Sequence, residues 1–183
     1  IPGVKILGIE PDSDYNRTVI TFAGTPNEVE HAAFLLIQAS ILEIDMRHHS
    51  GEHPRMGCVD VCPFVPISGV SMEQCIDIAQ RVAMKVGDLA VPVFMYGGAA
   101  SDTSRTSLSA LRKGEYEDLV HRFNGNSTVH GVSTCLPDFG TNQWDESAQR
   151  SGAITIGARD ILIAYNVNID EKDAKISKDN GIL

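Results

Sequence analysis

The spacing of apolar residues predicts two strands followed by a long helix in the first quarter of the chain. A short apolar run covers residues 4–9 and an alternating, β-branched run covers residues 17–23, with a turn-rich stretch between them. Thr25 can cap a helix, and Glu28, three residues later, completes a capping box. Apolar residues then recur at helical spacing, so we expect this helix to end at about residue 45.

The middle of the chain alternates between strand and helix patterns. Residues 59–67 (VDVCPFVPI) are strand-like, but their two prolines cannot donate to a ladder, which favours a sheet edge or a bulged strand. A second capping box starts at Ser71, and its apolar stripe continues to Val86. Residues 92–96 (PVFMY) predict a further strand that runs into a loop of small residues.

The last third of the sequence predicts a short helix around residues 115–123, a strand at 128–136 and a long polar loop at 140–152. A helical or bent turn at 157–159 and a strand at 161–169 follow. This order of elements predicts an α+β fold, in which helices pack on one face of a mixed β-sheet. We expect a two-layer, ferredoxin-like arrangement.

Composition places the chain among globular proteins. It has 183 residues, of which 43% are hydrophobic and 21% are charged. Fifteen basic and 24 acidic side chains give a net charge of −9, which argues against nucleic acid or an anionic membrane as partners. The four scattered cysteines and the absence of a membrane-spanning run or signal-like start favour a cytoplasmic protein.

Residues 47–57 (RHHSGEHPRMG) gather three histidines, two arginines and one glutamate. Four kinds of site fit this composition: a metal centre, an acid–base centre, an anion clamp and a solvated turn. A metal centre is disfavoured because the spacing lacks H-E-x-x-H, and because Gly51 and Pro54 interrupt any helix that would present the donors together. We therefore expect no metal.

Among the histidines, His53 is the best candidate for a proton shuttle. A neutral imidazole with a pKa near ~6.5 can both accept and donate a proton at physiological pH. Pro54 stiffens the backbone beside it, and Arg55 could supply charge for an anionic substrate. His48 and His49 are instead expected to end the preceding helix, where their charge suits its dipole. A metal held by the three histidines remains a rival hypothesis.

Arginine and glycine offer further contacts to an anion. A guanidinium matches a carboxylate with its planar fork, and six arginines are candidates: Arg17, Arg47, Arg55, Arg105, Arg112 and Arg159. Gly97, Gly98 and Gly140 could bring backbone N–H groups to a ligand, although such glycines are more often turns. The sequence contains no G-x-G-x-x-G, P-loop or G-x-S-x-G motif, so nucleotide binding by those routes and serine hydrolysis lose support.

A set of blocks carries a resemblance to a known family. They are NRTVITFAG (16–24), IDMRHHSGEHPRMGCVDVCPFVPISGVSMEQC (44–75), VPVFMYGGAA (91–100), R-x-S-L-x-A-L-R-K-G-E-Y-E (105–117), PDFG (137–140) and GARDILIAYNVNI (157–169). Together they closely resemble the N-terminal subdomain of glutamate formiminotransferase (glutamate formimidoyltransferase), from about residue 2 to residue 169. The long block around G-E-H-P-R-M-G is the most specific.

The resemblance implies an enzyme of histidine degradation and one-carbon metabolism. It implies transfer of a formimino group from N-formimino-L-glutamate to N5 of tetrahydrofolate, which would act as a co-substrate. The family's catalytic histidine lies in G-E-H-P-R-M-G and corresponds to His53. Its folate-binding segment follows P-D-F-G and corresponds to residues 140–152, which include Gly140, Thr141, Asn142, Gln143 and Gly152.

Our own hypothesis concerns the carboxylates, because both substrates carry a glutamate moiety. We expect Arg55 to bind one of them first, with Arg47 or Arg105 next, and Gly97 and Gly98 to approach a substrate with their backbones.

The sequence departs from the family pattern in several places. The family begins with a further strand and helix and continues into a second subdomain, and we expect residues 1–169 to form the N-terminal subdomain alone. Residues 170–183 are then a charged tail or the start of a following subdomain. The family's Y-G-E-A-A loop has Gly98 in place of glutamate. These departures keep a second hypothesis open, a folate-binding or interaction module that has lost turnover, and a homodimer is a further expectation.

Overall fold

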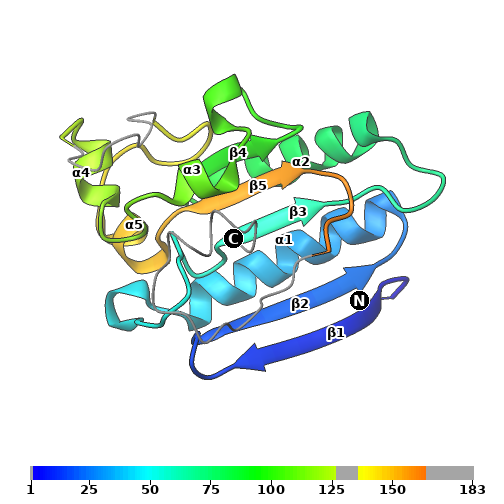
Figure 1. Cartoon of the computed structure of the whole chain (residues 1–183), viewed down its shortest axis with the longest axis horizontal. Coiled ribbons are helices and arrows are strands. Elements are labelled where there is room, and N and C mark those ends of the chain that lie inside the picture. Colours follow the sequence, from blue (N-terminus) through cyan, green and yellow to red (C-terminus); the bar gives the residue numbers. More distant parts are fainter. Residues whose placement is uncertain (1, 127–135, 164–183) are drawn as a thin grey trace, which may run out of the picture.

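The computed structural model describes residues 2–126 and 136–163. The chain begins with an antiparallel hairpin of β1 (Lys5–Asp12) and β2 (Arg17–Ala23) (Figure 1). The Asp12 carboxylate closes the turn by accepting hydrogen bonds from the backbone N–H groups of Asp14 and Tyr15, each at 3.0 Å. The hairpin predicted from the alternating pattern is therefore confirmed.

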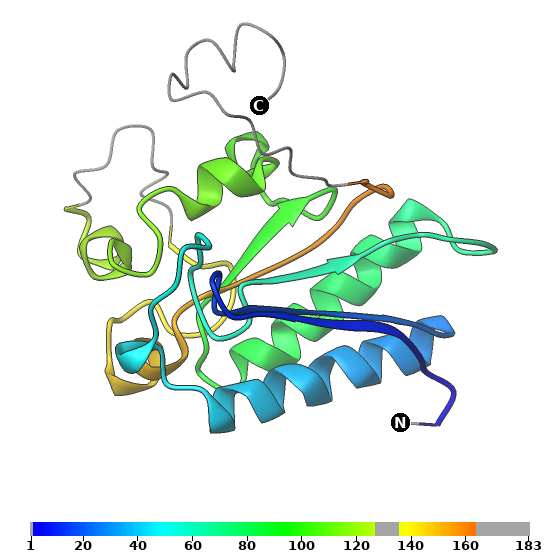
Figure 2. The same cartoon turned by 60° about the horizontal axis from the view of Figure 1, so that its bottom comes forward.

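Two long helices form one layer of the molecule. Helix α1 (Pro26–Glu43) starts at the capping box of Thr25 and Glu28, and α2 (Met72–Gly87) starts at that of Ser71 and Gln74. Both capping boxes were predicted from sequence, and α1 ends two residues before the predicted end. Figure 2 shows the two helices side by side beneath the strands.

A parallel sheet of three strands lies on these helices. Its strands are β3 (Val61–Phe64), β4 (Val93–Gly97) and β5 (Ile154–Ala158), in the order β3-β5-β4. β3 is a short edge strand, as its prolines predicted. β5 corrects the expected turn at 157–159, because Gly157 and Ala158 continue the central strand and pair with both neighbours. Gly157 fits there since a Cβ at this position would lie 2.6 Å from the Tyr96 ring.

The α+β class is confirmed, and the hydrogen bonding adds a detail. Within residues 2–126 and 136–163, β1 and β2 form one sheet while β3, β5 and β4 form another. The edges of β2 and β3 on the sides away from these partners carry no ladder hydrogen bonds within the described part of the chain. The predicted strand at 128–136 and most of that at 161–169 lie outside the described residues.

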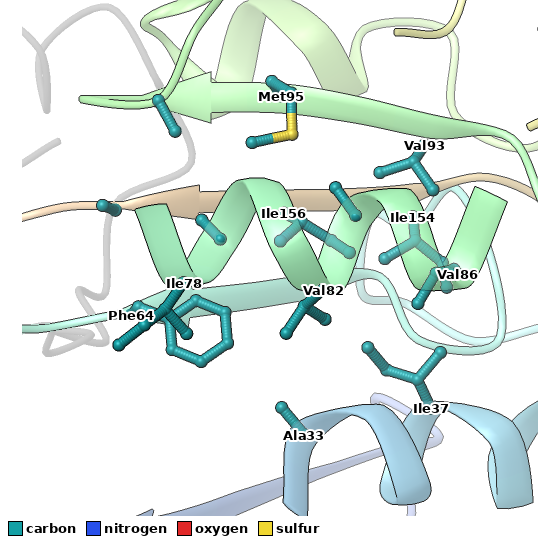
Figure 3. Packing of buried hydrophobic residues seen from close by; sticks show 14 of the residues in the cluster. Ala33, Ile37, Phe64, Ile78, Val82, Val86, Val93, Met95, Ile154 and Ile156 are labelled. Atoms are coloured by element: carbon teal, nitrogen blue, oxygen red, sulfur yellow. The ribbon is translucent and has the colours of Figure 1, made fainter. Parts of the chain in front are cut away.

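The hydrophobic core lies between the helices and the parallel sheet. Alternate residues of β4 point to opposite faces, so Val93 and Met95 pack toward α2 while Phe94 and Tyr96 face the other way. Figure 3 shows the helix-side cluster, which also includes Ala33, Ile37, Phe64, Ile78, Val82, Val86, Ile154 and Ile156. A second cluster on the opposite face contains Met56, Phe94, Tyr96, Leu111, Leu119 and Ala153.

Short helices cover this second face and the ends of the sheet. They are η1 (Met46–His48), η2 (Thr103–Arg105), α3 (Leu108–Arg112), α4 (Leu119–Phe123) and α5 (Glu146–Ser151). Helix α5 corrects the predicted polar loop at 140–152: Asp145 caps it by accepting a hydrogen bond from Ala148 N, and Ala148 is buried. No helix in the described ranges combines the length and the apolar character needed to cross a membrane.

The Glu30 carboxylate joins α1 to α2. It accepts hydrogen bonds from Arg81 Nε at 2.8 Å and Lys85 Nζ at 2.7 Å. Burial alone would raise the pKa of Glu30, but Lys85 and Arg81 outweigh it and hold this pKa below its ordinary value of 4.5. The ion pairs therefore contribute stability above that pH, and the contribution is lost as the pH falls through the lowered pKa.

Replacing Glu30 by glutamine should lower the free energy of unfolding by about 1 kcal/mol near pH ~7, since the exposed sides of Arg81 and Lys85 keep the pairs partly screened. The difference from wild type should shrink at a second, acidic pH below the lowered pKa of Glu30, where the carboxyl is protonated. Urea unfolding at both pH values measures it. A deficit that stays constant between them would contradict the ionic origin.

Candidate functional site

A broad open groove runs between β2 and β3, with a volume of ≈ 1740 Å³. Strand β2 and strand β3 form its walls, and residues of α1 line it between them. The groove also reaches the ends of β4 and β5 and the loop that contains His53 and Arg55. It therefore brings the predicted proton shuttle onto a surface large enough for two small substrates.

His53 lies half-buried in this loop, between η1 and β3. Its Nδ1 is 2.7 Å from the Pro54 carbonyl oxygen. Because a carbonyl oxygen only accepts, Nδ1 must carry the proton, which leaves Nε2 of the neutral ring as the acceptor. The Tyr15 ring packs edge-on against the imidazole, with 5.9 Å between centroids. The geometry thus suits His53 to take a proton at Nε2.

The other two histidines of the loop have different surroundings. Helix α1 ends at Glu43, so His48 and His49 do not end it as predicted; they are the last residue and the C-cap of the separate short helix η1. The Nε2 of His49 is 2.9 Å from Asn16 O, and its Nδ1 is 3.4 Å from Arg55 Nε. His49 therefore connects the hairpin turn to Arg55.

Metal binding at His48, His49 and His53 has no support from this geometry. In the described ranges, no group of three or more histidine, cysteine, aspartate or glutamate side chains is arranged to hold a metal ion.

Arg55, the first predicted carboxylate ligand, is already held by protein carboxylates. Its guanidinium donates to Glu117 at 2.7 Å and to Glu115 at 3.2 Å, and it lies 5.9 Å from the centre of the Tyr116 ring. The hydrogen bond to Arg55 holds the pKa of Glu117 below its usual value. Arg55 therefore ties the His53 loop to residues 115–117, and its substrate role stays a prediction.

The two alternative arginines are paired as well. Arg47 donates to Asp45 at 2.6 Å and comes within 3.9 Å of Glu146. Arg105 donates to Asp138 at 2.5 Å and to the Leu136 carbonyl oxygen at 3.0 Å. Neither arginine lines the groove of His53, and their substrate roles also stay predictions.

The glycines expected to approach a ligand are required by the fold. Gly97, Gly140 and Gly152 have positive φ values of 62°, 84° and 65°. A Cβ at Gly140 would overlap the carbonyl oxygen of Val91, and a Cβ at Gly152 or Gly97 would lie 2.2 Å or 2.5 Å from a backbone carbonyl oxygen. Gly98 is exposed, and its N–H donates to Ala158 O at 2.7 Å. Ligand contacts by these glycines stay predictions.

The segment expected to bind folate lies apart from the groove. Thr141 Oγ1 accepts a hydrogen bond from Gln143 N at 3.1 Å, which makes a local turn before α5, and Asn142 is exposed. None of residues 140–152 lines the groove. The structure therefore does not bring this segment together with His53, and folate binding by it stays a prediction.

Asp60 is a groove residue that the sequence reasoning missed. Its carboxylate forms an ion pair with Arg112 and accepts a hydrogen bond from Met56 N at 3.0 Å. Burial raises the pKa of Asp60, and the charges of Arg112 and His53 oppose that rise. Asp60 and His53 therefore line the same groove, and Asp60 brings a carboxylate into it. The sequence did not indicate a functional role for Asp60, because an aspartate just before a strand is commonly an exposed loop residue.

Of the three cysteines that line the groove, Cys58, Cys62 and Cys75, the first two are especially poor nucleophiles. Burial raises the pKa of Cys58 to about 11 and that of Cys62 to about 12. At pH ~8, we expect both to react with iodoacetamide on the order of a hundredfold or more slowly than a free thiol of pKa ~8.5. Peptide mass spectrometry of native and urea-unfolded protein measures this. Rapid modification of either cysteine in the native protein would contradict the assignment.

The sequence of the chain matches a known protein family and several known proteins. Residues 1–159 match the family described as formiminotransferase domain, N-terminal subdomain. The chain is 36% identical to glutamate formimidoyltransferase of Streptococcus pyogenes serotype M1, over 99% of this chain and 60% of that protein. It is 40% identical to glutamate formimidoyltransferase of Thermoplasma acidophilum, over 96% of this chain and 55% of that protein.

A third relative is formimidoyltransferase-cyclodeaminase of Sus scrofa, which is 41% identical over 92% of this chain and 29% of that protein. The chain thus spans 60% or less of the length of these three relatives. The match to the subdomain covers most of the sequence and includes every strand described above. The chain belongs to the formiminotransferase family, within its N-terminal subdomain.

Proposed function

We propose that this chain carries the acid–base centre of a formimino transfer from N-formimino-L-glutamate to N5 of tetrahydrofolate. The observation that supports this most is His53 itself, with Nδ1 fixed as a donor by the Pro54 carbonyl and Nε2 left as an acceptor beside a broad groove. The names of the relatives support the same reaction class. We further propose that the transfer serves histidine degradation and one-carbon metabolism in the cytoplasm.

The proposed reaction needs two proton transfers. N5 of tetrahydrofolate attacks the formimino carbon, forming a new C–N bond and a tetrahedral centre, while His53 Nε2 accepts the proton from N5. The imidazolium then returns a proton to the glutamate nitrogen as the old C–N bond breaks. The products are L-glutamate and 5-formiminotetrahydrofolate. A positioned acid–base group of this kind contributes roughly 10²–10⁴ in rate.

Asp60 and its partner Arg112 support the charged state of this cycle. Asp60 lines the same groove as His53, so its carboxylate would offset part of the positive charge that the imidazole carries during transfer. Arg112 in turn forms an ion pair with Asp60 and opposes the rise in the pKa of Asp60 that burial causes. Placing the two substrates side by side in the groove would lower the barrier further, because it removes much of the entropy cost of their encounter.

A second candidate function is folate binding without turnover. The chain spans 60% or less of the relatives above, and its groove is open to solvent, which weakens electrostatic stabilisation of a transition state. Titration calorimetry with tetrahydrofolate, combined with an assay for release of L-glutamate from N-formimino-L-glutamate, separates the two. We expect both binding and folate-dependent release. Binding without release would select the second function.

A further inference from the structure

The arginines that line the groove fall into two pairs. Arg55 and Arg112 are bound by protein carboxylates, whereas Arg17 and Arg159 have no carboxylate partner within the described part of the chain. A groove intended for substrates with glutamate carboxylates needs positive charge that the protein has not already neutralised. Arg17 and Arg159 meet this need, although the sequence favoured Arg55, Arg47 and Arg105.

Arg159 is better placed than Arg17 to meet a ligand. Arg17 lies over the Tyr15 ring, 5.6 Å from its centre, on the hairpin side of the groove. Arg159 directly follows β5, at the carboxyl ends of the three parallel strands, where ligands of open sheets commonly bind. Its backbone N–H donates to Phe64 O at 3.1 Å, which fixes its position, and its Nη1 donates to the Asp160 carbonyl oxygen at 2.9 Å.

Tyr96 supplies a second polar group beside Arg159. Its side chain lines the groove, yet the residue is only 3% exposed, and its hydroxyl is buried without a hydrogen-bond partner among the described residues. Burial raises the pKa of this hydroxyl, and both the charge of Arg159 and the closeness of its side chain to the hydroxyl oppose the rise. A buried hydroxyl left unpaired is costly, so a ligand atom that accepts its proton would bind favourably.

The backbone around Tyr96 explains how this pair is held. Gly157 of β5 leaves room for the Tyr96 ring, since a Cβ there would lie 2.6 Å from Cδ1 of the ring. Gly97, next to Tyr96, has a φ of 62°, and because it lacks a side chain the space near Arg159 stays open. The two glycines therefore keep the end of the sheet free of side chains beside Tyr96 and Arg159.

We propose that Arg159 and the Tyr96 hydroxyl form a carboxylate-binding subsite for a glutamate moiety, an inference that rests on the proposed function. The guanidinium would donate two hydrogen bonds to the carboxylate, and the hydroxyl would donate a third. The same chemistry fits a carboxylate of N-formimino-L-glutamate and the glutamate tail of tetrahydrofolate. Arg159 and Tyr96 would act as positioning residues, while His53 carries the proton.

Binding measurements test this subsite without requiring turnover. Calorimetry would compare N-formimino-L-glutamate, tetrahydrofolate and tetrahydropteroate, which lacks the glutamate, on wild type, Arg159→Gln and Tyr96→Phe. Arg159→Gln should weaken binding of a glutamate-bearing ligand roughly 10- to 100-fold, and Tyr96→Phe about 3- to 10-fold. Arg81→Gln is the matched control, because Arg81 on α2 pairs with Glu30 outside the groove; it should bind as wild type does.

The stability of Tyr96→Phe gives an independent readout. Because the hydroxyl has no partner in the described part of the protein, its removal should leave the melting temperature unchanged or raise it. A hydroxyl with a structural role would instead lower the melting temperature when removed. A clear fall would therefore overturn the assignment of this hydroxyl to a ligand.

The pattern of losses identifies the source of the carboxylate. Weaker binding of N-formimino-L-glutamate alone assigns the subsite to the formimino donor, and weaker binding of tetrahydrofolate but not of tetrahydropteroate assigns it to the folate tail. Wild-type affinity of Arg159→Gln for both substrates would overturn the subsite and leave the proposed function standing. Loss of binding in Arg159→Gln, with no transfer by wild type, would support the subsite and overturn the proposed function.

Discussion

Replacing His53 by alanine should reduce formimino transfer by roughly 10²–10⁴-fold, the usual contribution of a positioned acid–base group. The reason is that the Pro54 carbonyl fixes the proton of His53 on Nδ1. This leaves Nε2 as the proton acceptor beside the groove. The fold should persist, since His53 is half-buried and its hydrogen bond is to the carbonyl of the next residue. Initial rates and thermal unfolding of the same preparations measure the two effects.

His31→Ala provides a matched control for this substitution. His31 lies exposed on α1, outside the groove, so its removal should change neither rate nor melting temperature. Imidazole added to His53→Ala should restore part of the activity, because a small base can enter the space that the side chain leaves. Turnover by His53→Ala at the wild-type rate would exclude the proton-shuttle role.

Replacing Gly140 by alanine should have the largest effect on stability, a loss of about 3–5 kcal/mol in the free energy of unfolding. Gly140 has a φ of 84°, which alanine adopts only with strain, and its Cβ would overlap the Val91 carbonyl at the start of β4. The adjacent Phe139 bonds to Val93, so a shift would disturb the strand itself. Urea unfolding measures the loss.

Gly69→Ala separates strain from overlap. Gly69 has a similar φ of 70°, but nothing lies within 4 Å of a Cβ at that position. We expect a loss of only about 1 kcal/mol there. Equal losses at the two positions would contradict the steric account of Gly140. A large loss confined to Gly140 would also mean that weaker folate binding in a Gly140 variant does not by itself demonstrate a ligand contact.

The parts of the fold that sequence predicted well depend on local signals. Capping boxes at Thr25 and Ser71 fix the starts of α1 and α2, and the apolar repeat that follows each one fixes the buried face. The hairpin follows from alternation and a turn closed by Asp12. The prolines of β3 predicted an edge strand because they remove ladder donors. Each of these signals acts over a few neighbouring residues.

The features that sequence missed depend on distant partners. Gly157 looks like a turn residue in the sequence, but in the fold it is a strand residue whose missing side chain makes room for the Tyr96 ring. Helix α5 lies in a polar stretch, and it is held there partly by the burial of Ala148. The strands also form two separate sheets, and the alternation of apolar and polar residues within a strand does not specify which strands pair.

The candidate site shows the same division. His53 was identifiable from its motif, but the tautomer that makes Nε2 an acceptor depends on the direction of the Pro54 carbonyl. The arginines could not be ranked from composition, since a paired and an unpaired guanidinium look alike in a sequence. Arg55 finds Glu117 far along the chain, whereas Arg159 finds no carboxylate in the described residues. Only the folded arrangement distinguishes them.

The most direct measurement follows the formimino carbon itself. N-formimino-L-glutamate labelled with ¹³C at that carbon would be mixed with tetrahydrofolate and the chain, and its NMR signal recorded over time for wild type and His53→Ala. We predict that the label moves to N5 of tetrahydrofolate with wild type and stays on glutamate with His53→Ala. A label that never leaves glutamate with wild type, or that moves equally fast with His53→Ala, would contradict the account.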